Sequence, residues 1–293
     1  IGKNITLIEC QNDIIIVDCG MAFPDGDMLG VDLVIPDFTY IEQNADRVKG
    51  LVLTHGHEDH IGGLPFLLSK VNIPIFGTPL TLGLVENKLR EHSLISSAKL
   101  NVVNAGDVIR LGCMSVKFIH VNHSIPDAVA FAIKTPAGTI VHTGDFKIDC
   151  TPITGDMIDL SSFAQVGDEG VLALLAESTN AERPGYTPTE RLVSGSFDNL
   201  FRSAEKYRII IATFASNVNR VQQIIDCAEK YGRKVAFSGR SMVNYMEVAK
   251  KLGYLHVPEN ILIDIDMLDK YLPEEIVLVT TGSQGEPMSA LSR

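Results

Sequence analysis

The stretch Leu51-Val-Leu-Thr-His55-Gly-His57-Glu-Asp59-His60-Ile-Gly-Gly63 decides the fold of this chain and the place of its chemistry. Residues 51–53 form an apolar run typical of a buried strand, and side chains of metal-ligand type follow at once. Such a cluster is unusual in a chain with only 8 histidines. Neutral imidazoles and a carboxylate are suitable ligands for a borderline-soft divalent cation such as zinc.

The spacing of these ligands has geometric content. His55 and His57 sit two apart, so on an extended strand end they point the same way. Asp59 and His60 are adjacent, so they diverge and suit two neighbouring cations rather than one. The following glycine pair lets the backbone turn closely beneath the site before a helix begins. The pattern predicts a metal site, and a polar surface loop is the plainer alternative.

The HxHxDH pattern resembles the signature of the metallo-β-lactamase superfamily of two-metal hydrolases. Further words along the whole chain resemble the bacterial ribonuclease J family, which belongs to the β-CASP branch acting on nucleic acid. These words are Gly30-Val-Asp32-Leu-Val-Ile-Pro-Asp37, Asn122-His-Ser-Ile-Pro-Asp127, Gly144-Asp-Phe-Lys147, Glu177-Ser-Thr-Asn180, Ser238-Gly-Arg-Ser-Met242 and Gly282-Ser-Gln-Gly-Glu-Pro287.

The resemblance implies an α/β fold, a metallo-β-lactamase αββα sandwich with an inserted α/β β-CASP domain. From about Pro184 strands alternate with helices, which predicts a parallel sheet covered on both faces. We expect the N-terminal part of the metallo-β-lactamase domain over residues 1–183 and part of the β-CASP domain over residues 184–293.

Periodicity and capping residues place the elements. Strands are expected at residues 5–8, 14–17, 74–76, 100–103, 114–120, 130–135, 139–142, 171–176, 208–213, 234–237 and 274–280. Helices are expected at residues 64–69, 78–92, 192–206, 219–231 and 243–252.

Composition describes an ordinary globular protein, with 45% hydrophobic and 21% charged residues. No apolar run is long enough to span a bilayer, and no signal-peptide pattern opens the chain. The net charge of −11 argues against a surface coated uniformly for nucleic acid, although it leaves room for a local basic groove.

The cysteines are scattered, odd in number and without a CxxC spacing: Cys10, Cys19, Cys113, Cys150 and Cys227. This pattern favours a reducing, cytoplasmic setting over a disulfide framework.

The resemblance implies two cation sites. One would use His55, His57 and His123, the other Asp59 and His60, and Asp145 would bridge the two cations. The family implies zinc, with manganese or magnesium as alternatives, and calcium in some members.

Two histidines, His120 and His123, compete for one ligand position. His123 stands at a strand-to-loop junction, where the resemblance puts the ligand. His120 belongs to the preceding apolar run and is expected to pack in the core.

Besides Asp59, the predicted catalytic residues are Asp18 and Glu177, which the resemblance places behind the metal-binding histidines. Asp18 would orient them, or it would only bond a turn after its strand. Glu177 would contact one histidine, or it would cap a helix or loop. In some members of the family a structural calcium lies near the positions of Gly30 and Asp32, where a solvated acidic loop is the alternative.

Candidate RNA-binding residues follow two strands of the second half: Phe214, Ser216, Asn217 and Arg240. Helix N-termini after parallel strands present free N–H groups to anions. An aromatic ring at position 214 can stack on a base, and Arg240 can bind a phosphate through two hydrogen bonds. Ordinary capped turns are the alternative. The loop Gly282-Ser-Gln-Gly-Glu-Pro287 could let a nucleic-acid backbone approach.

The resemblance implies a metal-dependent ribonuclease, with 5′-to-3′ exonuclease and endonuclease activity on RNA in ribosomal RNA processing and messenger RNA decay. The chemistry is phosphodiester hydrolysis by two cations roughly 3.5–4 Å apart. It also implies preference for 5′-monophosphorylated RNA, no membrane partner, and a homodimer or larger assembly of the full-length parent. The rival readings are a metallo-β-lactamase-fold hydrolase of small esters or thioesters, and an RNA-binding fragment that does not cut.

In the resembled family two further histidine elements follow the inserted domain, and one completes the second metal site. Neither is present before Arg293, nor is the family's terminal domain. We therefore expect that these residues alone bind metal incompletely and have impaired activity.

Overall fold

The computed structural model describes residues 2–283 and 289–292. The chain folds as two compact units. The first unit consists of Ile1–His123, Asp127–Ile148 and Ile158–Tyr186, and the second of Ser124–Pro126, Asp149–Met157 and Thr187–Arg293. The chain passes from the first unit to the second for the last time after Tyr186, close to the predicted domain boundary at residue 183. Two short segments of the second unit lie earlier in the sequence.

The first sheet of the first unit has the order β1-β2-β3-β4-β5. Its strands are β1 (Thr6–Cys10), β2 (Asp13–Val17), β3 (Val48–Val52), β4 (Pro74–Gly77) and β5 (Lys99–Val102). β1 and β2 form an antiparallel hairpin, and the remaining neighbours are parallel. The carboxyl ends of β2, β3 and β4 therefore open on one edge, where side chains can converge.

The second sheet has the order β10-β9-β8-β7-β6. Its strands are β6 (Val108–Leu111), β7 (Met114–His120), β8 (Val129–Thr135), β9 (Gly138–His142) and β10 (Ala173–Leu175). All neighbours are antiparallel except β9 and β10. The sequence prediction missed β6, because a strand of 4 residues is too short to show a clear alternation of apolar and polar side chains.

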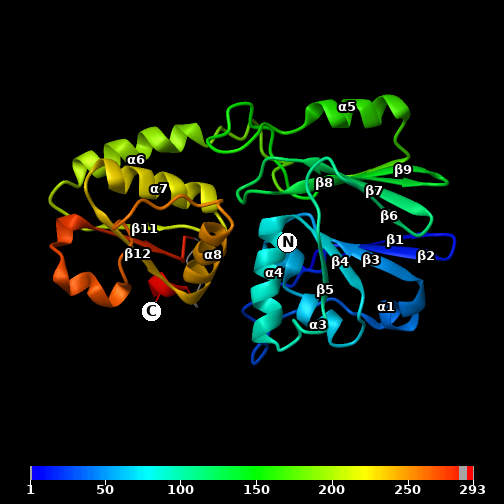
Figure 1. The fold of residues 1–293 in the computed structure, drawn as a ribbon. Helices are drawn as coiled ribbons and strands as arrows, with labels where there is room; N and C mark the ends of the chain where they lie inside the picture. Colours follow the sequence, from blue (N-terminus) through cyan, green and yellow to red (C-terminus); the bar gives the residue numbers. More distant parts are fainter. Residues whose placement is uncertain (1, 284–288, 293) are drawn as a thin grey trace. The chain divides into compact units, whose positions relative to one another are not determined.

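The two sheets pack face to face, and helices cover their outer sides. The helical elements are α1 (Thr39–Gln43), η1 (Ala45–Arg47), α2 (Glu58–Ile61), α3 (Leu64–Leu68), α4 (Pro79–Glu91) and α5 (Leu160–Glu169). Figure 1 shows α5 beyond the second sheet and α1, α3 and α4 beyond the first. The expected helix–sheet–sheet–helix order is therefore confirmed.

The core between the sheets is built from their inward-facing residues. Ile15 and Val52 of the first sheet belong to one buried cluster with Phe118 and Phe131 of the second. The two phenylalanine rings meet edge to face, with centroids 5.1 Å apart. Burying each such side chain contributes about 1.5–3 kcal/mol, so this core holds both sheet edges in place.

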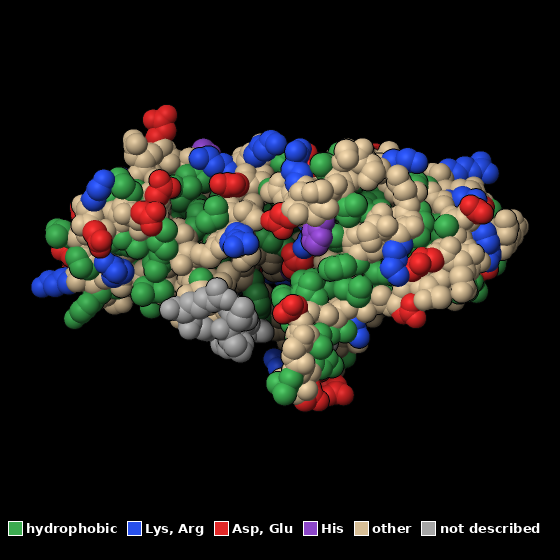
Figure 2. Space-filling view, turned by 90° about the horizontal axis from the view of Figure 1, so that it is seen from below, with side chains coloured by type: hydrophobic (Ala, Val, Ile, Leu, Met, Phe, Trp, Pro, Cys, Tyr) green, Lys and Arg blue, Asp and Glu red, His purple; other side chains and the backbone are tan. Residues whose placement is uncertain are grey.

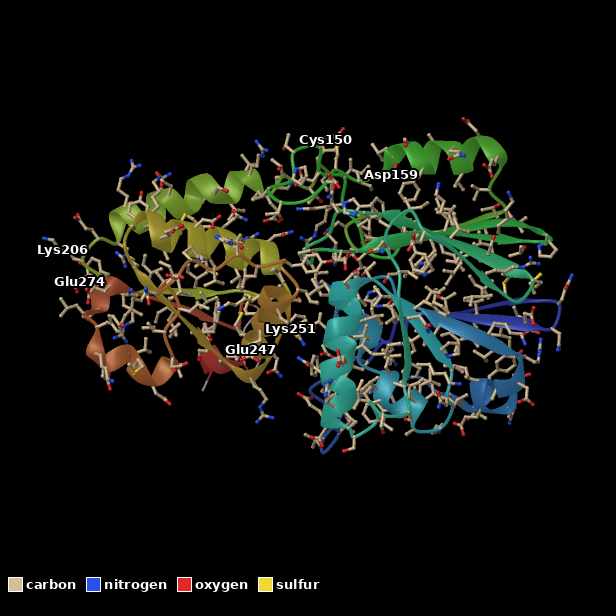
Figure 3. All side chains as sticks on the ribbon, viewed as in Figure 1. Cys150, Asp159, Lys206, Glu247, Lys251 and Glu274 are labelled. Atoms are coloured by element: carbon tan, nitrogen blue, oxygen red, sulfur yellow. The ribbon has the colours of Figure 1, made fainter. Side chains whose placement is uncertain are left out.

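Helix α5 was not predicted from the sequence. Only Ser162 and Val166 are buried along it, so its apolar pattern is weak. Asp159 precedes it and accepts a hydrogen bond from the Ser162 N–H at 2.9 Å. Figure 3 shows Asp159 where this helix begins, and this side-chain cap satisfies a backbone donor that would otherwise be unpaired.

The second unit contains a parallel sheet in the order β11-β13-β12. Its elements are α6 (Arg191–Ser203), β11 (Ile209–Ala212), α7 (Val218–Lys230), β12 (Lys234–Ser238), α8 (Arg240–Lys251), η2 (Ile265–Lys270), η3 (Pro273–Glu275), β13 (Ile276–Thr280) and η4 (Ala290–Ser292). Both α7 and α8 contact β12. The predicted parallel sheet with covering helices is confirmed.

The surface carries charges of both signs. Figure 2 shows acidic and basic side chains interspersed over one face rather than sorted by sign, which fits the argument against a uniform basic coat. Among the described residues, no helix is long and apolar enough to cross a membrane.

Candidate metal centre

The histidine loop begins where β3 ends. β3 pairs with β2 and β4 in parallel register, and Thr54 and His55 follow it as fully buried residues. His57 then stands at the N-cap position of α2. This turn of helix has 4 residues, which is too short to show apolar periodicity, so the sequence did not predict it.

Glycines let neighbouring backbone lie directly against this loop. A Cβ on Gly20 would lie 1.6 Å from the main-chain oxygen of Asp59, and one on Gly62 would lie 2.3 Å from Met21 Cγ. A Cβ on Gly63 would lie 2.7 Å from the Gly20 oxygen. Gly62 and Gly63 therefore allow the close backbone packing that the sequence predicts. Gly20 allows it as well, but only the tertiary structure shows that Gly20 lies against Asp59.

Three histidines turn ring nitrogens toward one another. His57 Nδ1 lies 3.1 Å from His55 Nε2 and 3.2 Å from His123 Nε2, and these three residues form one candidate ligand group. His123 reaches the group from the loop after β7. The competing His120 is within β7 and belongs to neither candidate group found among the described residues.

These imidazoles are held neutral. Burial, reinforced by neighbouring histidines, keeps the pKa of His55 well below its usual value. Burial and then His123 lower the pKa of His57 to about 3. Burial lowers the pKa of His123 to about 4, although Asp145 opposes this. Each neutral ring has one nitrogen lone pair. A divalent cation between the three rings would accept these lone pairs together, so the three histidines fit a metal site.

A second ligand group adjoins the first and shares His55 with it. It consists of His55, His60 and Asp145, with His60 Nε2 lying 3.5 Å from Asp145 Oδ1 and 3.6 Å from Asp59 Oδ2. The other oxygen of Asp145, Oδ2, lies 3.9 Å from His123 Nε2. The structure therefore brings all the predicted ligands together, and His55 belongs to both groups rather than to one. The expected divergence of Asp59 and His60 is wrong, because the helical turn of α2 places both side chains on the same side.

The second group is built to hold positive charge. Burial disfavours a charged His60, but Asp18, Asp145 and Asp59 outweigh it and raise the pKa of His60 to about 10. Burial likewise opposes the charge on Asp145, yet His60, followed by His123, lowers the pKa of this carboxyl. For Asp59 burial prevails and raises the pKa. A bound divalent cation would replace the His60 proton as the positive charge that balances these carboxylates.

Asp18 lies behind the candidate ligands, in contact with His60 and, through Thr54, with His55. It is buried with φ of 59°, and it accepts hydrogen bonds from the Thr54 N–H and hydroxyl, each at 2.8 Å. His60 Nδ1 lies 2.8 Å from Asp18 Oδ2, and His55 Nδ1 lies 3.0 Å from Thr54 Oγ1. With both Nδ1 atoms donating, the Nε2 lone pairs face the cation positions.

Comparison with known proteins places this geometry in a family. The family model of the "Metallo-beta-lactamase superfamily" matches residues 2–188. The chain belongs to the metallo-beta-lactamase superfamily. A second model, "Ribonuclease J, beta-CASP domain", matches residues 206–293, and with the relatives described next it confirms the resemblance to ribonuclease J proteins.

Several relatives of this metallo-beta-lactamase chain are ribonuclease J proteins. It is 45% identical to "Ribonuclease J2" of Bacillus subtilis over 293 residues, which are 100% of this chain and 53% of the relative. It is 49% identical to "Ribonuclease J" of Mycobacterium tuberculosis over 100% of this chain and 52% of that protein, and 46% identical to that of Helicobacter pylori over 42% of it. The chain thus spans about half the length of these relatives.

One solved structure shares the fold alone. A protein of unknown function from Enterococcus faecalis superposes on 97% of this chain and 75% of its own with a TM-score of 0.67 at 16% identity. The family models and the sequence relatives do not favour the rival interpretation as a hydrolase of small esters.

Glu177 lies beside the metallo-beta-lactamase site but is bonded locally. Its backbone N–H donates to Thr143 Oγ1 at 3.1 Å, and its carboxylate accepts from the Thr179 N–H at 2.8 Å. Its charge nevertheless acts on His123, where it favours a higher pKa. Glu177 also lines a cavity of about 340 Å³ together with His60 and Asp145.

The predicted RNA-binding residues lie at the carboxyl edge of the parallel sheet in the second unit. Phe214 and Ser216 follow β11, and the Phe214 side chain is 48% exposed. Asn217 caps α7 by accepting from the Arg220 N–H at 3.0 Å, so a structural role already occupies its carbonyl oxygen. Arg240 is exposed and opens α8.

Two further predictions concern loops. Of the loop Gly282-Ser-Gln-Gly-Glu-Pro287, residues 284–287 lie outside the described residues, and Gly282 has φ of 119°. Gly30, with φ of 78°, and Asp32 are exposed. Within the described part of the chain, the clusters of metal-ligand side chains are both in the histidine site, so the calcium site stays a prediction.

Sequence reasoning missed Thr54 as a functional residue. Its hydroxyl links Asp18 to His55, and it stands directly before the first histidine of the motif. Its place next to His55 is the one sequence feature that indicates a role in the site. The contact between Thr54 and Asp18 is visible only in the tertiary structure.

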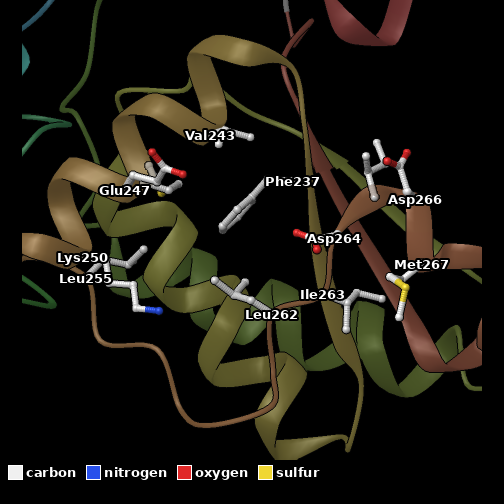
Figure 4. A pocket seen from close by; sticks show the side chains of 12 residues that line it. Phe237, Val243, Glu247, Lys250, Leu255, Leu262, Ile263, Asp264, Asp266 and Met267 are labelled. Atoms are coloured by element: carbon white, nitrogen blue, oxygen red, sulfur yellow. The ribbon is translucent and has the colours of Figure 1, made fainter. Parts of the chain in front are cut away.

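The second unit has a separate groove of about 710 Å³ between α8 and the segment at residues 262–267. Figure 4 shows Phe237 pointing into it, with Glu247, Lys250 and Asp264 at its sides. None of the metal-ligand clusters found among residues 2–283 and 289–292 lies in this groove, and it plays no part in the metal centre.

Proposed function

We propose that this chain is the nuclease part of a ribonuclease J-type enzyme and hydrolyses phosphodiester bonds in RNA with two divalent cations. The observation that carries the proposal is Asp145, whose Oδ1 lies 3.5 Å from His60 Nε2 and whose Oδ2 lies 3.9 Å from His123 Nε2. A carboxylate shared by two ligand groups suits a pair of cations. Relatives named Ribonuclease J support RNA as the substrate.

Zinc suits the nitrogen-rich group, with manganese or magnesium as alternatives. Bound cations would generate a nucleophile from water at neutral pH and stabilise charge on the phosphate oxygens. The imidazoles of His55, His57 and His123 would hold one cation, and Asp59 and His60 the other, with Asp145 between them. Asp18 and Glu177 would keep the histidines oriented from behind.

The second unit would bind the RNA. The exposed ring of Phe214 would stack on a base, and Arg240 would pair with a phosphate. Ser216 and Asn217, at the start of α7, would present polar groups to the RNA backbone. As the resemblance to the ribonuclease J family implies, the enzyme would act as a 5′-to-3′ exonuclease and as an endonuclease in RNA maturation and decay. It would prefer 5′-monophosphorylated RNA.

The proposal extends to the compartment and the assembly. The five cysteines are free, which supports a reducing compartment such as the cytoplasm. A homodimer or larger assembly, and calcium near Gly30 and Asp32, rest on the resemblance alone.

The test compares the purified protein with the double variant Asp59→Ala, His60→Ala. A 5′-monophosphorylated RNA is incubated with each protein in zinc or manganese, and bound metal is measured in parallel. The matched control is Glu91→Ala, His92→Ala, which removes another adjacent acid and histidine at the exposed end of α4.

We expect weak but measurable metal-dependent cleavage by the wild type and the control, in keeping with the impaired activity expected above, and loss of cleavage and of bound metal in the double variant. RNA binding without cleavage by the metal-loaded wild type would refute the proposal. Equal cleavage by the wild type and the double variant would refute it as well.

A further inference from the structure

Asn4, just before β1, contacts the histidine loop through its side chain. Its Nδ2 lies 3.0 Å from the main-chain oxygen of Asp59 and 3.2 Å from Asp59 Oδ2. It also lies 3.1 Å from His60 Nε2. A single amide outside the ligand groups therefore touches both residues that are expected to hold the second cation.

The amide orientation follows from its neighbours. Both Asp59 atoms near it are acceptors, so the nitrogen and not the oxygen of the amide must face them. An amide nitrogen carries two hydrogens, one for each Asp59 oxygen. His60 Nδ1 faces Asp18 Oδ2 at 2.8 Å, so the His60 proton that a cation would displace is the one on Nε2, and the lone pair freed there is not used by the Asn4 amide.

The backbone holds this amide in place. The Asn4 N–H donates to the Asp59 main-chain oxygen at 3.0 Å, and the Gly20 N–H donates to the Asn4 oxygen at 2.9 Å. Because Gly20 leaves no room for a Cβ beside Asp59, these segments lie in direct contact. Asn4 also lines the cavity of about 340 Å³ that His60 and Asp145 face.

We propose that Asn4 is a positioning residue that aims the Asp59 carboxylate at the cation shared with His60. This inference rests on the two-cation site proposed above. The Asn4 amide holds Asp59 Oδ2 at 3.2 Å, and this oxygen lies 3.6 Å from His60 Nε2. The carboxylate is therefore already held beside His60 and loses little conformational freedom when a cation binds there. Partners of this kind outside the ligand set affect metal affinity by about 10–100-fold.

The test is a cobalt(II) titration of the metal-free protein followed by visible absorption, which separates nitrogen-rich from oxygen-rich binding. The variants are Asn4→Ala, Asp59→Ala and the two combined, with Asn72→Ala as the matched control. The Asn72 amide also donates to a main-chain oxygen, that of Ser97 at 3.1 Å, but on the exposed surface away from the histidines. If Asn4→Ala does not fold by circular dichroism, Asn4→Leu repeats the measurement with the side-chain size kept.

We expect Asn4→Ala to weaken binding of one of the two ions by about 10–100-fold and to leave the other unchanged. In the Asp59→Ala background the same substitution should have no further effect, because Asn4 acts through that carboxylate. Wild-type affinity for both ions in Asn4→Ala overturns the proposal, as does an equal loss of both ions or a persistent effect without Asp59. If the wild type binds no cobalt, the two-cation site itself is refuted, and that outcome differs from all the others.

Discussion

At the scale of single residues, we propose that Asp18 orients His55 and His60 so that their Nε2 atoms face the cation positions. Its two oxygens accept hydrogen bonds from Thr54 and face His60 Nδ1. The Thr54 hydroxyl passes this orientation on to His55. A buried carboxylate is tolerated at this position because both of its oxygens face hydrogen-bond donors.

Asp18→Asn should reduce metal affinity by about 10–100-fold. Asparagine keeps the shape of aspartate and tolerates the positive φ, but its NH₂ group must face either the Thr54 N–H or His60 Nδ1. Metal titration measures the affinity, and circular dichroism checks that the fold is kept. Unchanged affinity would show that Asp18 does not orient the ligands.

Among the cysteines, reactivity should follow burial. Cys19 is fully buried, and burial, with the nearby charge of Asp18, raises the pKa of its thiol. Cys150 is exposed and lies in a loop, where Figure 3 labels it. A maleimide at neutral pH should therefore label Cys150 in the native protein and Cys19 only after unfolding, as read by peptide mass spectrometry. Equal labelling of both in the native state would contradict the buried position of Cys19.

At the scale of elements, α5 depends on one capping side chain. Asp159 accepts from the Ser162 N–H and the Ser161 hydroxyl, and the hydrogen bonds from Ser162 lower the pKa of this carboxyl. A lowered pKa in the folded state means that the stabilisation is present above the unfolded pKa and is lost as the pH falls through the folded value.

Asp159→Ala should therefore destabilise the protein by about 1 kcal/mol at pH 7. Its difference from the wild type should shrink as the pH falls below about 4. Urea unfolding at several pH values measures both effects. Asp168→Ala, in the last turn of the same helix, is the control and should be neutral or slightly stabilising, because an acid there opposes the helix dipole. A cap effect that grows as the pH falls would contradict this account.

At the scale of the whole molecule, the two compact units differ in their relation to metal. Both candidate ligand groups lie in the first unit, and the described part of the second unit contains no such cluster. A ligand that binds only the folded state stabilises it by about 2.7 kcal/mol at a concentration 100 times its Kd. Metal should therefore stabilise the units unequally.

Removing metal with a chelator should increase hydrogen exchange around residues 54–61, 122–123 and 144–145. Exchange in α7 and α8 of the second unit should stay unchanged. Mass spectrometry of deuterated peptides measures both regions in one experiment, so the second unit serves as the internal control. Equal loss of protection in the two units would indicate that metal stabilises the chain as a whole.

The sequence alone predicted most of the strands, the helices α4, α6, α7 and α8, and the residues that we expect as metal ligands. Apolar periodicity and closely spaced histidines are local properties, so residues such as His55 and His57 could be identified before any contact was known. It did not predict α2 and α5, because a short turn and a mostly exposed helix leave little apolar pattern.

Only the tertiary structure decided which distant groups support the ligands. Asp18 meets Thr54 and His60 because the parallel strands β2 and β3 end at the same sheet edge. Asn4 meets Asp59 at this edge because β1 is antiparallel to β2, so that β1 begins where β2 ends. These contacts depend on packing across the sheet, and neither residue type nor spacing along the chain encodes them.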